Sequence, residues 1–289
     1  VNHPSTTSAP RGKSLSISAD DFQAVQKFLL ENSGISLAAG KEYLVEGRLQ
    51  SLVYSEKFDD IHALVVKLKG DREGDLGKKV VEALTTNETS FFRDKHPFET
   101  LKTAVIPELL NKPELGKRIT IWSAASSSGQ EPYSLAMLLA DSFAWATDWQ
   151  IKIVASDISE EMLTKCRSGL YSQFEISRGL PAHYLPRFLQ RAGSQWQMKE
   201  EIRERIDFRY LNLYEDWVGL PRVDIIFMRN VLIYFEADTK TAILEKILKV
   251  LRPGGYLFLG SGEVPVGLEN RFQPADFSTS ACFKLTPAP

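Results

Sequence analysis

Cysteine and histidine are scarce in this chain, which holds two cysteines and four histidines among 289 residues. Cys166 and Cys282 show no CxxC or metal-ligand spacing, and so few thiols are typical of a protein in the reducing cytoplasm. His62, His96 and His183 fit neither a proton relay nor a metal site. We therefore expect a cytoplasmic protein without a metal, with both cysteines in its core.

Two further absences narrow the class of protein. The 35 basic and 37 acidic residues leave a formal charge of −2, so no overall basic field favours nucleic acid. No apolar run reaches the ~18 residues that span a bilayer, and the opening VNHPSTTSAPRGKS has no apolar stretch typical of a secretion signal. We expect a disordered tail at 1–14, no nucleic-acid partner and no membrane insertion.

What the chain does contain is a change of pattern between its two parts. Apolar residues recur at helical spacing over about 19–32, 41–55, 61–69 and 76–84, so residues 15–85 predict a small helical domain. From Arg118 onward strands alternate with helices, which predicts an α/β domain over 118–289 with a mostly parallel sheet and right-handed crossovers. The strands expected are ITIWSA, IKIVASD, RIDFRYL, VDIIFMR and GGYLFLG. Residues 86–117 form an interdomain segment.

One connection in the α/β part is too long for a helix and a loop. Asp157, at the end of the second strand, and Asn212, after the third, lie 55 residues apart. The excess predicts a small inserted subdomain at about 168–205.

The stretch ITIWSAASSSGQEPYSLAM at 119–137 predicts a strand, a turn of small residues and a helix. Such a junction is a small-molecule site, because ligands bind beyond the carboxyl ends of parallel strands and helix starts favour electron-rich groups. Residues 126–129 carry little bulk, and Pro132 suits the first helical turn. Glu131 has two interpretations: it stabilises the helix dipole, or it holds a cationic amine.

Asp157 narrows the choice of ligand. It ends a strand 26 residues after Glu131, where α/β nucleotide sites place a carboxylate that binds a ribose. The turn holds a single glycine, so it lacks the G-x-G-x-x-G pattern that brings the backbone close to a pyrophosphate. S-adenosylmethionine fits both observations, since it carries ribose and adenine without phosphates and an ammonium group that can pair with Glu131.

LRPGG at 251–255 resembles a turn common in methyltransferases of this fold. Four other motifs occur together in a specific order: TTNETSFFRD at 85–94, EPYSLAM at 131–137, Asn212-Leu213 and IIFMRNVLIYF at 225–235. In order and spacing they resemble the CheR-type family, the bacterial chemotaxis receptor glutamate methyltransferases, over residues 15–286. The resemblance implies a Rossmann-like S-adenosylmethionine-dependent methyltransferase domain with an inserted small β-subdomain, preceded by an N-terminal helical domain. It implies methyl transfer to glutamate side chains on the cytoplasmic helices of chemoreceptors, giving γ-methyl esters and S-adenosylhomocysteine.

The same resemblance assigns residues to the site. Those expected near the cofactor are Asn87, Thr89, Arg93, Glu131, Asp157, Asn212, Leu213, Arg229 and Asn230. Glu131 would lie at the amino-acid end, Asp157 at the ribose and Asn212 with Leu213 at the adenine. Arg93, Arg229 and Tyr234 are the expected catalytic residues. From the residues alone, a second interpretation is that Arg93 only caps a helix and that Tyr234 is a core aromatic with a satisfied hydroxyl.

The resemblance also implies docking to the receptor bundle through basic residues of the second N-terminal helix. Arg48 matches this pattern, whereas Gln50 and Ser51 stand where basic character is expected. Lys41 and Lys57 either compensate in part or are only solvated helix charges. The inserted GSQWQMKEE is shorter than the β-subdomain of relatives that grip a C-terminal receptor pentapeptide, so we expect binding that needs no such tether. Separately, we expect a monomer.

Three other functions stay open from the sequence. A methyltransferase of a small carboxylic acid would have no use for the helical domain or the insertion. An NAD-dependent oxidoreductase is disfavoured by the missing glycines. The third alternative is a non-catalytic S-adenosylmethionine-binding module.

Overall fold

The computed structural model describes residues 16–70, 74–275 and 281–286, and the expected tail at 1–14 lies outside them. The chain divides into two compact units. Unit 1 comprises Val1–Asn32 and Ser36–Thr85, and unit 2 comprises Ser33–Ile35 and Thr86–Pro289. None of the described helices is long and apolar enough to cross a membrane.

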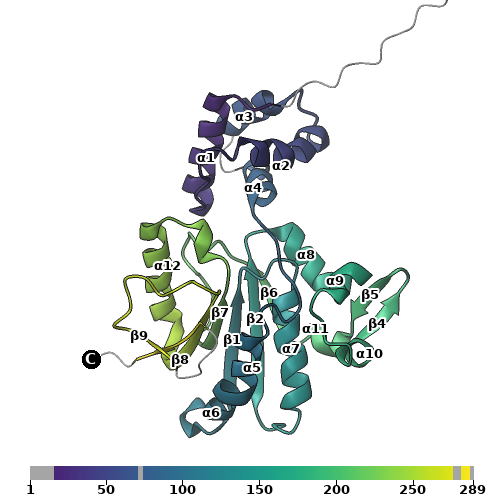
Figure 1. Ribbon diagram of the computed structural model, residues 1–289, viewed down its shortest axis with the longest axis vertical. Helices are drawn as coiled ribbons and strands as arrows, with labels where there is room; N and C mark the ends of the chain where they lie inside the picture. The colour runs from purple at the N-terminus through teal and green to yellow at the C-terminus, as the bar shows by residue number, and fades with distance from the viewer. Residues whose placement is uncertain (1–15, 71–73, 276–280, 287–289) are drawn as a thin grey trace, which may run out of the picture. The chain divides into compact units, whose positions relative to one another are not determined.

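Unit 1 is helical, as its 3.6-residue periodicity predicts. Its described helices are α1 (Ala19–Ser33), α2 (Glu42–Ser55), α3 (Ile61–Gly70) and α4 (Asp75–Leu84) (Figure 1). Ser18 caps the start of α1, because its Oγ accepts a hydrogen bond of 3.1 Å from the backbone N–H of Asp21. Each helix turns an apolar face inward; in α2 this face consists of Val45, Leu49, Leu52 and Val53.

Arg48 ties two helices of unit 1 together. Its Nη1 donates to the carbonyl oxygens of Leu84 and Thr85, at 2.5 and 2.9 Å. These carbonyls lie at the end of α4, where helical backbone acceptors lack partners within the helix. The guanidinium of Arg48 therefore has a structural task within unit 1, whereas Lys41 and Lys57 are exposed.

Unit 2 is built on a seven-stranded sheet with the strand order β6-β2-β1-β7-β8-β10-β9. Its strands are β1 (Arg118–Ala124), β2 (Gln150–Asp157), β6 (Ile206–Tyr210), β7 (Val223–Met228), β8 (Leu251–Leu259), β9 (Phe272–Pro274) and β10 (Cys282–Leu285). The first five strands in this order are parallel, which confirms the predicted sheet, and β10 and β9 add an antiparallel edge. The sequence pattern does not predict these last two strands, because they are too short to show an alternation.

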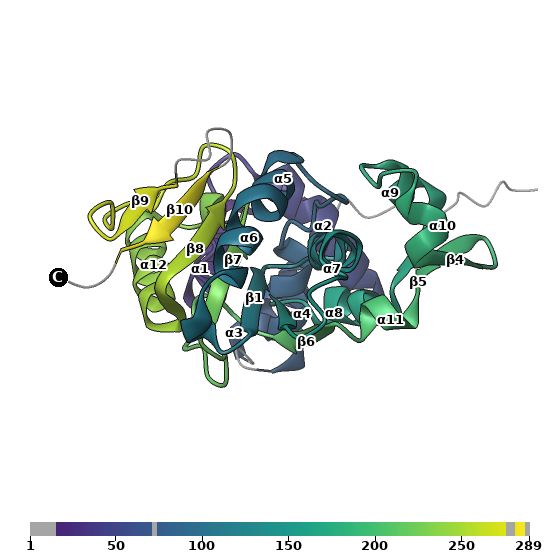
Figure 2. The same ribbon diagram turned by 90° about the horizontal axis from the view of Figure 1, so that it is seen from below.

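Helices cover both faces of the sheet (Figure 2). The main helices of unit 2 are α5 (His96–Thr100), η1 (Leu101–Val105), α6 (Ile106–Leu110), α7 (Gln130–Ser142), α8 (Glu160–Ser168) and α12 (Ala237–Val250). Alternate strand residues face two separate cores: Ile119 and Ile121 pack with α5 to α7, whereas Trp122 and Ala124 pack in the core that includes α12. The short helices η2 (Pro113–Leu115) and η3 (Leu232–Tyr234) lie in connections.

The predicted insertion is present between α8 and β6. Its elements are β3 (Leu170–Tyr171), α9 (Gln173–Ser177), α10 (Tyr184–Phe188), β4 (Leu189–Ala192), β5 (Gln195–Met198) and α11 (Glu200–Arg203). The three strands form an antiparallel sheet in the order β3-β5-β4. Within unit 2, the insertion and the β9–β10 edge lie at opposite sides (Figures 1 and 2). The fold class read from the sequence is thereby confirmed.

A cluster around Glu108 fastens α6 to the antiparallel side of the sheet. The Glu108 carboxylate accepts hydrogen bonds from Lys112 at 2.8 Å, from Lys284 of β10 at 2.7 Å and from the Tyr256 hydroxyl of β8. Burial raises the pKa of Glu108, but these three donors outweigh burial and lower the pKa from 4.5 to about 2.

This cluster predicts a pH-dependent contribution to stability. Because the folded-state pKa of Glu108 lies below that of the unfolded chain, its contribution is complete above about pH 4.5 and is lost as the pH falls toward 2. We expect Glu108→Gln to lower the free energy of unfolding by about 1 kcal/mol at pH 7 and by progressively less in acid. Urea titrations at several pH values measure this difference. Glu114→Gln, at an exposed carboxylate nearby, is the control; equal curves for both variants would contradict the assignment.

Candidate active site

The turn after β1 has an irregular backbone that its surroundings hold in place. Ala125, Ser127 and Gly129 adopt positive φ angles of 53°, 50° and 93°. Asp157, which ends β2, fixes this turn: its Oδ2 accepts from the backbone N–H of Ser127 at 2.7 Å and its Oδ1 from that of Ser159 at 2.9 Å. The carboxylate predicted to contact a ligand is thus also what orients the turn.

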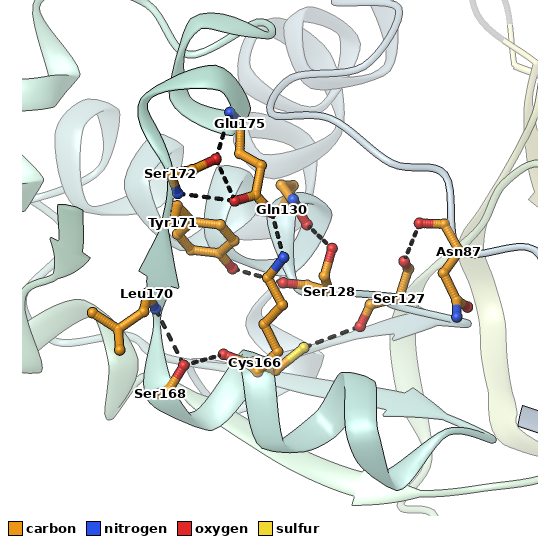
Figure 3. Close-up of polar contacts among 11 residues, drawn as sticks. Asn87, Ser127, Ser128, Gln130, Cys166, Ser168, Leu170, Tyr171, Ser172 and Glu175 are labelled. Carbon is orange, nitrogen blue, oxygen red and sulfur yellow. Dashed lines mark hydrogen bonds and ion pairs between the residues drawn. The ribbon is translucent and has the colours of Figure 1, made fainter. Parts of the chain in front are cut away.

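Groups from α8 and the insertion hold the other side of this turn (Figure 3). The Cys166 thiol donates to the carbonyl of Ser127 at 3.1 Å, and the Tyr171 hydroxyl donates to that of Ser128 at 2.8 Å. Burial raises the pKa of Cys166 to about 12, so the thiol keeps its proton and stays a donor. A Cβ at Gly129 would lie 2.9 Å from both the Cys166 sulfur and the Tyr171 oxygen, so only glycine fits there.

Glu131 belongs to a network of charges that joins three segments. Its Oε1 accepts from the Ser123 hydroxyl of β1 at 2.8 Å, and its Oε2 accepts from Arg229 Nη1 at 3.0 Å. Arg229 directly follows β7, and its Nη2 donates to Asp94 Oδ2 at 2.6 Å and to the Arg93 carbonyl at 3.0 Å. The Arg229 side chain is only 2% exposed, so its charge depends on these partners.

The segment at 87–93 contacts the turn after β1 and helix α7. The Asn87 carbonyl accepts from the Ser127 hydroxyl at 2.8 Å, and the backbone N–H of Phe92 donates to the Ser134 hydroxyl of α7 at 2.9 Å. Arg93 is half-buried, and its Nη1 donates to the Glu88 carbonyl at 3.0 Å. Asn87 and Thr89 are half-buried too.

The Asn212–Leu213 turn follows β6. Asn212 is buried; its Oδ1 accepts from the backbone N–H of Tyr214 and its Nδ2 donates to Glu215, both at 3.0 Å. Lys246 of α12 secures this turn, because its Nζ donates to the carbonyls of Leu213, Tyr214 and Glu215 at 2.8 to 2.9 Å. Burial lowers the pKa of Lys246.

The remaining predicted residues, Asn230 and Tyr234, follow β7. Asn230 has a φ of 58°, and Tyr234 ends η3 with a half-buried ring.

The sheet order β6-β2-β1-β7 places Asn212, Asp157, the 125–129 turn and Arg229 beyond the carboxyl ends of four neighbouring parallel strands. Hydrogen bonds through Ser127 link Asn87 with Asp157, and a second set of bonds links Glu131, Arg229 and the Arg93 carbonyl. The segment at 87–94 contributes to both sets.

Sequence reasoning missed the residues that support the site from outside it. Tyr171, Cys166 and Lys246 hold backbone carbonyls, and no motif marks a residue for that task. Asp94 stands beside the predicted Arg93, but its pairing with Arg229 spans 135 positions and leaves no local signal.

The site keeps some capacity to accept hydrogen bonds. Glu131 accepts two of the bonds described above, and a carboxylate has about four acceptor positions, so it can accept more. Among the described residues, no group of three or more His, Cys, Asp or Glu could hold a metal ion. Fold and site together define a Rossmann-like methyltransferase domain.

Comparison with known proteins identifies the family. The all-alpha domain of CheR methyltransferases matches residues 20–85, and their SAM-binding domain matches residues 87–281. The chain is 43% identical to the chemotaxis protein methyltransferase Cher2 of Pseudomonas putida and 43% identical to chemotaxis protein methyltransferase 1 of Pseudomonas aeruginosa. Each alignment covers 91% of this chain and 97% of the relative. Chemotaxis protein methyltransferase 1 of Vibrio cholerae is 38% identical, over 94% of this chain and 98% of its own. The chain belongs to the CheR methyltransferases.

Tyr171 offers a test of how the turn is supported. Tyr171→Phe removes the hydroxyl that donates to Ser128 and should raise the dissociation constant for S-adenosylhomocysteine about 5-fold, the equivalent of one hydrogen bond of about 1 kcal/mol. Isothermal calorimetry measures this. Tyr184→Phe is the matched control, because it also removes one hydroxyl from the insertion, but that hydroxyl bonds Asp141 instead of the turn. Unchanged affinity in both variants would show that Tyr171 does not hold the binding conformation.

Proposed function

We propose that this protein transfers a methyl group from S-adenosylmethionine to glutamate side chains on the cytoplasmic helices of bacterial chemoreceptors. The products are glutamate γ-methyl esters and S-adenosylhomocysteine, and the reaction serves adaptation in chemotaxis. The observation that carries the proposal is the match to chemotaxis protein methyltransferases across nearly the whole chain.

We propose the following residues for the cofactor. Asp157 accepts hydrogen bonds from the ribose hydroxyls, and Glu131 pairs with the ammonium group while it stays bound to Arg229. Asn212 and Leu213 border the adenine. Asn87, Thr89 and Asn230 contact the remainder, and no metal takes part. Support comes from the position of these residues beyond the carboxyl ends of the parallel strands.

The reaction requires little acid–base chemistry. The pKa of a free glutamate is about 4.3, so near pH 7 it is already an anionic nucleophile. The sulfonium of S-adenosylmethionine is an activated leaving group, so no general base is needed. The protein must align carboxylate oxygen, methyl carbon and sulfur at roughly 3 Å contact and remove water from the nucleophile.

The charges of the site suit an anionic acceptor. Glu131, Asp94 and Asp157 bring three negative charges, which Arg229, Arg93 and the sulfonium of the cofactor balance before the acceptor binds. Arg93 supplies the second positive charge; apart from the bond to Glu88, the structure gives its guanidinium no protein partner among the described residues. We therefore propose that Arg93 attracts the glutamate carboxylate and that Tyr234 contacts the methyl region. We propose that Arg229 positions Glu131 and the Arg93 backbone within the site.

The acceptor is proposed to dock on unit 1. Lys41 and Lys57 are exposed and are proposed to meet an acidic receptor bundle in the cytoplasm, while Arg48 holds α2 and α4 together. The protein is proposed to act as a monomer.

The decisive experiment is transfer of a radiolabelled methyl group to receptor-containing membranes. We expect label that mild alkali releases as methanol, as a carboxyl ester requires.

Tyr234→Phe and Arg93→Ala should lower the rate at least 10-fold while the affinity for S-adenosylhomocysteine changes less than 3-fold, because both residues act on the transferred group. Tyr184→Phe serves as the control. Equal losses of rate and affinity would remove the catalytic roles. Label in a small acid, with none in receptors, would favour the alternative substrate, and binding without any transfer would indicate a cofactor-binding module.

A calorimetric titration tests the expectation that the protein does not bind the C-terminal pentapeptide of a receptor. We expect no measurable heat when a receptor C-terminal pentapeptide is added to the protein, because the β4–β5 hairpin is short. Micromolar affinity would contradict this expectation.

A further inference from the structure

Glu263 is a buried carboxylate directly behind the segment that carries Asn230 and Tyr234. It is 7% exposed and accepts hydrogen bonds from three backbone N–H groups. Its Oε2 accepts from Gly260 at 2.6 Å and from Asn230 at 2.8 Å, and its Oε1 accepts from Ile233 at 3.3 Å. Hydrogen bonds to an ionised acceptor are the strong kind, so one side chain holds two chain segments together.

The segment it holds has an unfavourable backbone. Asn230 has a φ of 58°, a left-handed conformation that side-chain-bearing residues adopt only when their surroundings enforce it. Ile233 lies within η3, which ends at Tyr234. The two amides that Glu263 binds in this segment therefore flank the turn that sets the position of Tyr234.

Gly260 provides an independent observation at the same place. It follows β8, and Leu259 of β8 pairs with Met228 of β7, so the two strand ends lie side by side. A Cβ at Gly260 would lie 2.6 Å from Glu263 Oε2 and 2.7 Å from Asn230 Nδ2. The carboxylate and the Asn230 side chain are thus packed against a position that tolerates only glycine.

We propose that Glu263 is a positioning residue for methyl transfer: through Asn230 and Ile233 it fixes the turn that places Tyr234. This inference rests on the proposed function, since it assigns the turn to the reaction. Glu263 itself contacts neither cofactor nor acceptor in this proposal.

The test is Glu263→Gln, which keeps the size of the side chain but presents an amide N–H₂ to backbone N–H donors. We expect methyl transfer to receptor membranes to fall at least 10-fold at a temperature where circular dichroism shows the variant folded. Glu269→Gln is the matched control, because Glu269 is an exposed glutamate of the same loop that accepts from the backbone of Gly267 at 3.0 Å. We expect the control to transfer methyl groups at the wild-type rate.

A double-mutant cycle with Tyr234→Phe separates positioning from stability alone. If Glu263 acts through the turn, the double variant is no slower than about 2-fold below the slower single variant. If the role of Glu263 is purely structural, Glu263→Gln lowers the melting temperature but leaves the rate of the folded protein unchanged. If Glu263 does not act through Tyr234, the rate losses of the two single variants add. An unchanged rate or additive losses would overturn the proposal. Gly260→Ala should reproduce the loss of rate.

A wild-type measurement keeps the inference testable if both variants fail to fold. The amides of Gly260, Asn230 and Ile233 should be protected from hydrogen exchange, and rapid exchange at Asn230 and Ile233 would contradict the assignment. Failure of the proposed function is distinguishable, because wild-type protein would then bind S-adenosylhomocysteine without labelling receptors, whereas failure of this inference leaves wild-type transfer intact.

Discussion

The buried guanidinium of Arg229 is the constraint on which the site depends. It binds Glu131 at the start of α7, Asp94 before α5 and the Arg93 carbonyl, so the end of β7 is joined to two other segments. Removing the partner of a buried charge costs about 3–5 kcal/mol, which makes these segments mutually dependent. Arg229 thereby adds a shared partner to Glu131 and the 91–94 turn, which Ser123 and Ser134 also hold.

Strained backbone gathers around this network. Six of the eight described non-glycine residues with positive φ lie in its three segments: Phe92, Asp94, Lys95, Ala125, Ser127 and Asn230. Such conformations persist only where neighbouring groups determine them. Here the neighbours come from regular parts of the fold, with Tyr171 from the insertion, Cys166 from α8 and Asp157 from β2. The insertion therefore helps to hold the turn after β1.

The proposed chemistry agrees with this construction. A glutamate that is already anionic needs placement and charge compensation, and ion pairs hold the Arg229 guanidinium between the carboxylates of Glu131 and Asp94. The same reasoning explains why scarce histidine is no obstacle to catalysis. Arginine suits the task because it keeps its charge when buried and binds carboxylates with a planar fork.

The sequence by itself determined the features that depend on neighbours along the chain. Helical periodicity predicted the helices of unit 1, apolar runs predicted five parallel strands, and the distance from Asp157 to Asn212 predicted the insertion. The single glycine in the turn after β1 indicated a ligand without pyrophosphate. Only the tertiary structure decided that Arg229 pairs with Asp94, that Tyr171 holds Ser128 and that Arg48 closes α4. These contacts join residues 36 to 135 positions apart, and such pairings follow from strand order and side-chain geometry, which no local pattern records.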